Sequence, residues 1–449
     1  MSRSTNNPTG PKSYFVKSFG CQMNVYDGER MAELLDDEGL AAVDNAEAAD
    51  LVILNTCHIR EKAAEKVYSD IGRLRRDDGS TPMIAVAGCV AQAEGAEIPR
   101  RAREVDIVVG PQAYHNLPEL VAKAARGEDA LDTDMPAASK FGKLPQRAKQ
   151  APSAFLTVQE GCDKFCTYCV VPYTRGAEVS RPWGAVLDEA NALADAGAKE
   201  ITLLGQNVNA WQAEDEKGRE QGLDGLIHAL DRIEGLERIR YTTSHPNDMT
   251  QGLIDAHGEV GKLMPYLHLP VQSGSDAILK AMNRSHSVES YLAVIERVRE
   301  ARPDIAISGD FIVGFPGESE ADFEATLEIV RATRYAQAFS FKYSARPGTP
   351  AADMEDVFVA PEIADERLQR LQALLNEHQI AFNQETVGKR TRLLLERDGR
   401  KPGQRIGKSP WLQSVHLETD APIGAIIDVD IVSAGPNSLA GTLPERAAA

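Results

Sequence analysis

The N-terminal part of the chain alternates short apolar runs with longer segments of helical spacing. The apolar runs are residues 14–19, 51–54 and 83–87, and each is as long as a buried strand. Residues 27–38 and 61–75, which lie between these runs, have the periodicity of amphipathic helices. This β-α-β-α-β order predicts a parallel sheet with helices on its faces.

The same pattern continues with a strand at residues 106–109 and a helix at 117–125. We therefore expect an N-terminal α/β domain over residues 12–127. Residues 128–152 lose the periodicity and are rich in small, charged and proline residues, which predicts a linker.

A second alternating series follows and predicts a partial (β/α)6 barrel over residues 153–382. Such a barrel is an incomplete relative of the (β/α)8 fold, with its active site at the C-terminal ends of the strands. Helical stretches such as residues 186–196 and 287–301 lie between its strands. The expected strands are residues 155–159, 200–204, 238–243, 266–269, 305–312 and 338–343.

The C-terminal region combines one amphipathic helix with short β runs. Residues 361–385 place Leu368, Leu371, Leu374 and Leu375 on one side of a helix. Residues 383–445 contain β runs separated by glycine and proline turns, which predicts a small OB-like barrel. The expected β runs are residues 392–395, 414–417 and 426–432. The overall fold class is α/β.

We expect this protein to be cytoplasmic. No apolar run approaches the ~20 residues needed to span a bilayer, and residues 1–13 lack the apolar stretch of a signal peptide, so we expect no membrane association. The formal charge of −18 argues against a nucleic-acid partner for the whole chain. Residues 389–408 are locally basic, however, and form either a phosphate-binding surface or a solvated charge run.

Three of the six cysteines form the strongest local signal, a C-x3-C-x2-C loop made by Cys162, Cys166 and Cys169. Without an export signal, metal ligation is a better explanation for these thiols than disulfides. Three thiolates hold three irons of a cubane cluster and leave one iron open for a ligand. Structural zinc is the alternative, but it needs a fourth ligand, and this loop contains none.

The other three cysteines, Cys21, Cys57 and Cys89, each follow the C-terminal end of a predicted strand of the first sheet. The carboxyl ends of parallel strands share one edge, where such sheets bind ligands. We therefore expect a second thiolate site there, with core packing of small cysteines as the alternative. Polar residues follow the strands of the second series in the same way, namely Gln206, Asn207, His245, Gln272, Ser273 and Asp310. They are candidates to surround a bound cofactor, and the alternative is that they are ordinary turn and cap residues.

The cysteine spacing, with Tyr168 before the last cysteine and a partial barrel after it, resembles the radical S-adenosylmethionine superfamily. That resemblance implies a catalytic 4Fe–4S cluster whose open iron binds S-adenosylmethionine, with Tyr168 near the cofactor.

The two cysteine sets together resemble the methylthiotransferases from about residue 12 to 443. Further family-like sequence strings occupy residues 159–162, 172–176, 204–208, 243–246, 269–275 and 314–318. Two more strings resemble the bacterial branch that methylthiolates isopentenyladenosine beside the tRNA anticodon, at residues 340–349 and 407–410. The resemblance implies two 4Fe–4S clusters, with Cys21, Cys57 and Cys89 on the sulfur-inserting one. It also implies a TRAM-like RNA-binding barrel, a tRNA anticodon stem-loop as substrate, a reductant such as flavodoxin or ferredoxin, and iron–sulfur assembly machinery.

Two other functions remain open from the sequence. One is a methylthiotransferase that acts on a ribosomal protein side chain. The other is a non-catalytic RNA-binding protein with structural zinc. The basic residues 389–408 favour RNA over a protein substrate.

Overall fold

The computed structural model describes residues 10–58, 61–76, 78–135, 140–145, 147 and 151–444. Its contacts divide the chain into two compact units. The first unit contains residues 1–147 together with two later pieces, 160–163 and 169–178. The second unit contains residues 148–159, 164–168 and 179–449.

The first unit is built on a six-stranded sheet in which all neighbouring strands are parallel, as the sequence predicted. The central strand is buried at every residue because both of its faces are covered. The strands are β1 (Ser13–Ser18), β2 (Ala41–Ala42), β3 (Leu51–Thr56), β4 (Met83–Gly88), β5 (Ile107–Val109) and β6 (Leu131–Asp132), in the order β2-β1-β3-β4-β5-β6.

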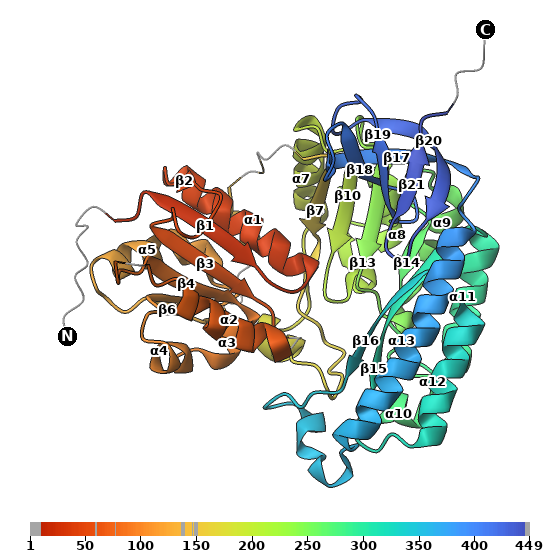
Figure 1. Cartoon of the computed structure of the whole chain (residues 1–449), viewed down its shortest axis with the longest axis horizontal. Coiled ribbons are helices and arrows are strands. Elements are labelled where there is room, and N and C mark those ends of the chain that lie inside the picture. Colours follow the sequence, from red (N-terminus) through yellow and green to blue (C-terminus); the bar gives the residue numbers. More distant parts are fainter. Residues whose placement is uncertain are drawn as a thin grey trace. The chain divides into compact units, whose positions relative to one another are not determined.

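Helices cover both faces of this sheet (Figure 1). Leu51 and Ile53 of β3 pack in the same core as α1 (Gln22–Asp37) and α5 (Leu117–Ala125). Val52 and Leu54 point the other way, into a core formed with α2 (Glu61–Arg73), α3 (Cys89–Glu94) and α4 (Glu97–Arg101). Successive strand residues alternate between the two cores because side chains of a strand point to opposite faces.

The segment expected to be an irregular linker contributes to this unit. Strand β6 pairs with β5 at the edge of the sheet, and the Val108 amide donates to the Ala130 carbonyl at 3.0 Å. Lys140, on a short 3₁₀ turn, is fully buried. A two-residue strand has no periodicity that a sequence could display, so the pattern missed it.

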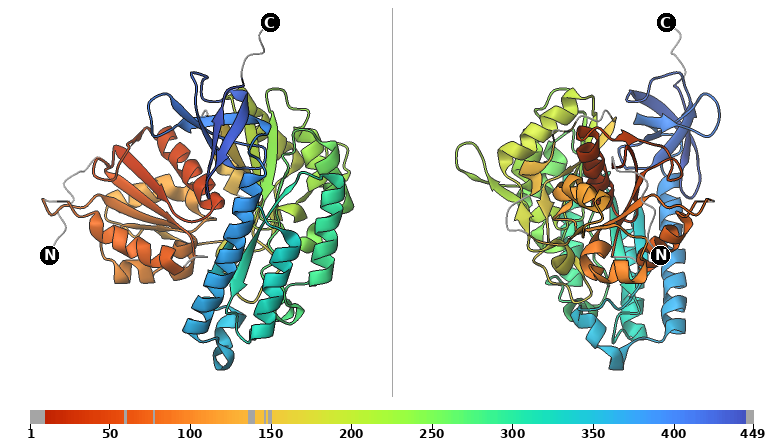
Figure 2. Two further views of the ribbon diagram at one scale, coloured as in Figure 1. Left: turned by 45° about the vertical axis from the view of Figure 1, so that its right-hand side comes forward. Right: turned by 90° about the vertical axis from the view of Figure 1, so that its left-hand side faces the viewer.

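The second unit contains the predicted partial barrel of six strands. Two three-stranded sheets, β7-β10-β13 and β14-β15-β16, meet where Ile239 bridges Leu263. Helices α11 (Val288–Ala301), α12 (Glu320–Thr333) and α13 (Pro361–Gln384) lie side by side along β14–β16 (Figure 2). The strands are β7 (Ser153–Thr157), β10 (Glu200–Leu204), β13 (Arg238–Thr242), β14 (Tyr266–His268), β15 (Ala306–Val313) and β16 (Gln337–Lys342). The remaining helices are α7 (Trp183–Asp195), α8 (Leu223–Leu230), α9 (Gln251–Glu259) and α10 (Asp276–Ala281).

The chain ends in a closed five-stranded barrel, which confirms the prediction of a small β-barrel. The three predicted β runs correspond to β17, β19 and β20, whereas β18 and β21 were missed. The strands are β17 (Arg390–Asp398), β18 (Gln404–Lys408), β19 (Ser414–Glu418), β20 (Ile426–Ala434) and β21 (Leu439–Thr442), closed in the order β17-β18-β19-β21-β20. Among the described helices, none combines the length and the apolar character that crossing a bilayer requires.

Two buried arginines attach this barrel to the strands of the second unit. Arg238 donates to the carbonyls of Arg392 and Lys408 at 2.7 and 2.8 Å. Arg240 donates to the carbonyls of Ser409 and Pro410, and Glu200 neutralises it at 3.0 Å. Glu200 and Arg238 are the first residues of β10 and β13, so the barrel lies at the N-terminal ends of these strands.

Candidate active site

Strand register brings the first three cysteines to one edge of the sheet. In the parallel pairing, Asn55 stands opposite Ser18, and Thr56 stands opposite Gly88. Cys57 and Cys89 therefore leave neighbouring strands at the same level. Cys21 caps the N-terminus of α1, three residues after β1 ends.

Hydrogen bonds between the loops hold this edge together. The Phe19 amide donates to the Asn55 carbonyl at 2.8 Å, and the Asn55 side chain donates to the Asn24 carbonyl at 2.6 Å. Gly20 has a φ of +104°, and a Cβ on it would lie 2.2 Å from the Cys57 Cβ. Only glycine permits this approach, which places the backbone before Cys21 directly against Cys57.

The electrostatics of the three thiols favour a thiolate at Cys21. A hydrogen bond with the Cys57 side chain, helped by the positive charge of Arg175, lowers the pKa of Cys21 to about 6 against the opposing effect of burial. Burial raises the pKa of Cys89, and the charge of Arg175 again opposes the shift. Iron–sulfur ligation requires thiolates, so the mutual contact and the adjacent cation both suit it.

A cluster and a single metal ion make different demands on the three thiols. In the described part of the chain, no three His, Cys, Asp or Glu side chains are grouped closely enough to hold one metal ion. A cubane has a different requirement, because each of its irons takes its own cysteine and the ligands stand apart around it.

The C-x3-C-x2-C loop is held by different contacts at each of its cysteines. The Cys162 amide donates to the Gly176 carbonyl at 3.3 Å, and the Cys169 sulfur accepts from the Val171 amide at 3.5 Å. The Cys166 sulfur lies 3.9 Å from Nη1 of Arg284. Amide and guanidinium donors toward a sulfur stabilise its thiolate form.

Two of the predicted polar residues, Gln206 and Asn207, lie in a connected network at the strand ends of the second unit. Oε1 of Gln159 accepts from the amides of Gln206 and Asn207 at 2.9 and 3.1 Å. The Asn207 side chain donates to Asp248, which also pairs with Lys164 at 2.7 Å. These bonds fix the loop after β10.

His245 follows β13 and is buried and neutral. Burial, with the nearby charges of Arg284 and Lys164, lowers the pKa of His245 to about 2. Its Nδ1 accepts from the Asn247 amide at 3.3 Å, so Nε2 carries the proton in this tautomer. Among the described residues, Nε2 has no hydrogen-bond partner. A buried donor without a partner fits a site that binds a polar ligand.

The other predicted residues have contacts of several kinds. Gln272 has a φ of +79°, and its amide donates to the Asp310 carbonyl at 3.0 Å. The Asp310 carboxylate lies 3.5 Å from Nε2 of His268. Ser273 contacts Thr326 at 3.4 Å and accepts from the Ser275 amide, which is the pattern of a turn residue. The Tyr168 ring packs in a small apolar cluster with Ile278, Met282 and Phe315.

Two residues of this region escaped the sequence analysis, namely Arg284 and His286. Arg284 reaches Cys166 and also donates to the Pro270 carbonyl. The His286 ring lies edge-on to His245 with 5.7 Å between the ring centres, and burial lowers the pKa of His286 to about 4. Both residues lie in a loop that follows helix α10 rather than a strand, so the strand-end rule did not find them.

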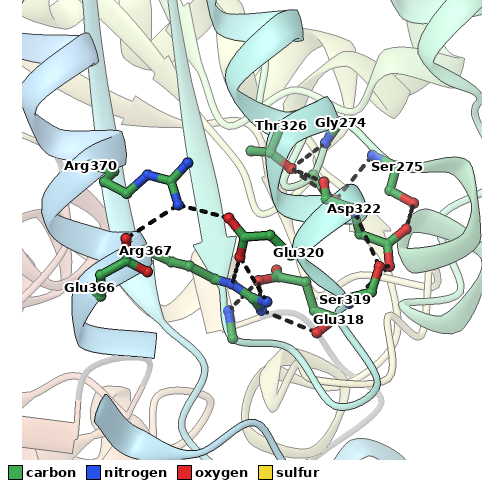
Figure 3. A network of polar contacts seen from close by, with 12 residues as sticks. Gly274, Ser275, Glu318, Ser319, Glu320, Asp322, Thr326, Glu366, Arg367 and Arg370 are labelled. Carbon is green, nitrogen blue, oxygen red and sulfur yellow. Dashed lines mark hydrogen bonds and ion pairs between the residues drawn. The ribbon is translucent and has the colours of Figure 1, made fainter. Parts of the chain in front are cut away.

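The turn at Gly314–Gly317 has a structural explanation. Glu318 accepts from the Gly314 amide at 3.1 Å. It also accepts from Arg367 at 2.7 Å, within the network drawn in Figure 3. A Cβ on Gly314, whose φ is +69°, would lie 2.7 Å from the Cβ of Ala364 on α13. Close packing against α13 therefore requires this glycine.

Two protein families match the chain. Residues 13–110 match the family described as uncharacterized protein family UPF0004, and residues 156–330 match the radical SAM superfamily. Solved structures of low sequence identity share the fold. The radical S-adenosylmethionine methyltransferase TsrM from Kitasatospora setae is 14% identical and superposes with a TM-score of 0.56, covering 88% of this chain and 76% of TsrM. The cobalamin-dependent radical enzyme OxsB is 13% identical with a TM-score of 0.52, covering 83% of this chain and 57% of OxsB.

Curated relatives are much more similar over nearly the full length. The tRNA-2-methylthio-N(6)-dimethylallyladenosine synthase of Sphingopyxis alaskensis is 75% identical, covering 96% of this chain and 97% of the relative. The enzymes of the same name from Zymomonas mobilis and Novosphingobium aromaticivorans are 69% and 67% identical, covering 96% and 99% of this chain and 96% and 100% of the respective relatives. The radical SAM superfamily uses a 4Fe–4S cluster and S-adenosylmethionine. The chain belongs to the radical SAM methylthiotransferase family, in the group of the tRNA-2-methylthio-N(6)-dimethylallyladenosine synthases.

Proposed function

We propose that this protein methylthiolates C2 of N6-isopentenyladenosine beside the tRNA anticodon and uses two 4Fe–4S clusters. The observation that carries the proposal is the meeting of Cys21, Cys57 and Cys89 at one sheet edge, in addition to the cysteine loop typical of radical SAM enzymes. The names of the relatives supply the substrate.

The two sets of cysteines have different proposed roles. Cys21, Cys57 and Cys89 hold the cluster concerned with the inserted sulfur, and Cys162, Cys166 and Cys169 hold the cluster that binds S-adenosylmethionine. When bound, this cofactor supplies both the methyl group and a radical able to remove hydrogen from an aromatic C–H, which is not acidic enough for a general base. Neutral His245 offers a hydrogen bond without adding charge. The proposed surroundings of the cofactor also include Tyr168, Gln206, Asn207, Gln272, Ser273 and Asp310.

The proposed domains are residues 12–127, with the first cluster, residues 153–382, with the radical SAM core, and residues 383–445, a TRAM-like barrel for RNA. The proposed partners are the tRNA anticodon stem-loop, a flavodoxin or ferredoxin as reductant, and the iron–sulfur assembly machinery. We place the reaction in the cytoplasm, where tRNA is modified.

The proposal is tested by nucleoside mass spectrometry of tRNA from cells that lack the gene, complemented with variants. The native gene should restore the 2-methylthio nucleoside, and Cys57→Ala should not. Purified, reconstituted Cys57→Ala protein should still cleave S-adenosylmethionine slowly, because its radical cluster is intact.

Iron content separates the alternatives. The reconstituted protein should hold about eight irons if both clusters are cubanes, and the variant with Cys162, Cys166 and Cys169 changed to Ala should keep about half. Stoichiometric zinc without acid-labile sulfide would instead identify an RNA-binding module. Normal tRNA nucleosides in the deletion strain, with a ribosomal protein lacking a methylthio group, would identify the protein-modifying alternative.

A further inference from the structure

Arg175 is a buried cation of the first unit that the proposed chemistry has not yet used. It ends α6 (Val171–Arg175), a short helix directly after the C-x3-C-x2-C loop. Its side chain is only 3% exposed, and it pairs with Asp27 at 2.6 Å and with Glu160 at 3.1 Å. Asp27 belongs to α1, which begins directly after Cys21.

Lys140 is the second cation of the same network. Its amino group is fully buried, 2.8 Å from Glu160 and 3.7 Å from Asp27, and it donates to the Pro111 carbonyl at 2.7 Å. Two cations thus face two carboxylates, and all four side chains are at most 4% exposed. Buried charges persist only where they are paired and hydrogen-bonded, so this network has one well-defined geometry.

The two cations differ in their relation to the cysteines. Helix α6 packs against α3, and the first residue of α3 is Cys89. The positive charge of Arg175 opposes the burial that raises the pKa of Cys89, and it helps to lower the pKa of Cys21. Lys140 is directed instead to the Pro111 carbonyl and over the Tyr114 ring, 4.3 Å from the ring centre.

We propose that Arg175 is a positioning residue of the first cluster, which donates a hydrogen bond to the Cys89 sulfur and compensates the cluster's negative charge. The inference rests on the proposed first cluster. Arg175 has the donors for this role, because a guanidinium presents five N–H groups in a fixed fork. Asp27 and Glu160 orient the fork, and further N–H groups remain for the sulfur.

The physical consequence is a change in the redox balance of that cluster. Hydrogen bonds to sulfur and nearby positive charge raise the reduction potential, because reduction adds negative charge to an already negative cluster. Without Arg175, the cluster should be harder to reduce and less firmly held. The residue lies six positions after Cys169, so one stretch of chain serves both cysteine sets.

The test uses full-length protein with Cys162, Cys166 and Cys169 changed to Ala, so that only first-cluster iron remains. In this background, Arg175→Met, Arg175→Lys and Lys140→Met are compared by iron content and by a redox titration followed by electron paramagnetic resonance. Lys140→Met is the matched control, since it removes the other buried cation from the same two carboxylates. Circular dichroism checks folding.

Arg175→Met should lose at least half of the background iron. The iron that remains should shift at least tenfold toward the oxidised state at a given potential, ~59 mV for a one-electron couple. Arg175→Lys, which keeps the charge and loses the fork, should fold and show a smaller shift in the same direction. Lys140→Met should keep the background potential.

Two results would overturn the inference. The first is that the background, Arg175→Lys and Arg175→Met have equal potentials and iron contents, or that Arg175→Met and Lys140→Met show equal shifts in potential. Either finding would mean that Arg175 only forms a structural ion pair, and it would leave the proposed first cluster in place. Absence of iron and sulfide from the background protein would remove the first cluster itself, and the inference with it.

Discussion

At the scale of single residues, the second unit contains histidines whose surroundings keep them neutral. His257 is fully buried on α9, and the hydroxyl of Tyr241 lies 2.6 Å from its Nε2. Burial, together with the charge of Arg302, lowers the pKa of His257 from 6.5 to about 3. Unlike His245 and His286, it stands apart from the proposed cofactor site, so its effect on stability can be measured separately.

The free energy of unfolding should therefore decrease as the pH is lowered, and part of this decrease should depend on His257. Below pH 6.5 His257 binds a proton in the unfolded state but stays neutral in the folded state. The contribution of neutral His257 to the free energy of unfolding is therefore constant above that pH, and it is lost as the pH falls toward 3. At pH 5 the loss should be about 2 kcal/mol. Chemical unfolding of the native protein and His257→Gln at pH 7.5 and about 5 checks this, since the Gln variant should show the smaller loss.

The control is His228→Gln, because the His228 side chain is 42% exposed. Its loss of stability between the two pH values should match that of the native protein. The same loss in His257→Gln as in the native protein would contradict the prediction.

At the scale of elements, the C-terminal barrel has two kinds of basic side chain. Arg390 pairs with Asp430 at 2.8 Å, Arg392 with Glu237 at 3.7 Å, and Arg405 with Asp398. Arg397, Arg400 and Lys401 are exposed, and in the described part of the chain none of them has an ion pair. These three cations lie at the end of β17 and in the turn before β18.

The exposed set should therefore dominate any contact with tRNA phosphates. Changing Arg397, Arg400 and Lys401 to Ala should weaken tRNA binding and flatten its salt dependence by up to about 0.7 in log–log slope per lost contact on single-stranded regions. Changing Arg390, Arg392 and Arg405 to Ala should have the smaller effect, because acids already neutralise these charges. Fluorescence anisotropy with an anticodon stem-loop at several salt concentrations measures both.

Equal effects of the two sets would mean that the ion pairs open on binding. Unchanged affinity in both would place RNA recognition outside the barrel and leave residues 389–408 as a solvated charge run. The barrel's attachment at the N-terminal ends of β10 and β13 should survive both sets, because Arg238 and Arg240 bind main-chain carbonyls.

At the scale of the whole molecule, the first unit is assembled from three stretches of chain. Residues 160–163 and 169–178 belong to it although they follow the first strand of the second series. They supply Glu160 and Arg175, which pair with Asp27 and Lys140 in the N-terminal stretch. Without these two later segments, the buried Asp27 carboxylate and the buried Lys140 amine have too few partners. The free energy of unfolding of the first unit should then be lower by several kcal/mol.

A fragment of residues 10–147 should therefore be incomplete. We expect it to melt at a lower temperature than the first unit of the full protein, and a reduced synthetic peptide of residues 159–178 should bind it and raise its melting temperature. The same peptide with Glu160→Ala and Arg175→Ala should not. A fragment as stable alone as with the native peptide would show that these later pieces contribute nothing to the first unit.

Much of the architecture was predictable because it depends on local periodicity. Long apolar runs such as Leu51–Leu54 and helices such as Pro361–Gln384 are specified by spacing, and the strand-end rule located Cys57 and Cys89 because parallel strands end at one edge. The two-residue strand β6 and the barrel strands β18 and β21 were missed, since their short runs have no distinctive period.

The sequence by itself determined which residues are the candidates for the chemistry, since cysteine spacing and strand-end position are properties of the chain's order. Only the tertiary structure decided what surrounds them. Arg175 and Asp27 are 148 residues apart, and Arg284 and Cys166 are 118 apart. No local pattern encodes such pairs, because a buried charge finds its partner through packing, and packing joins segments that are distant in sequence.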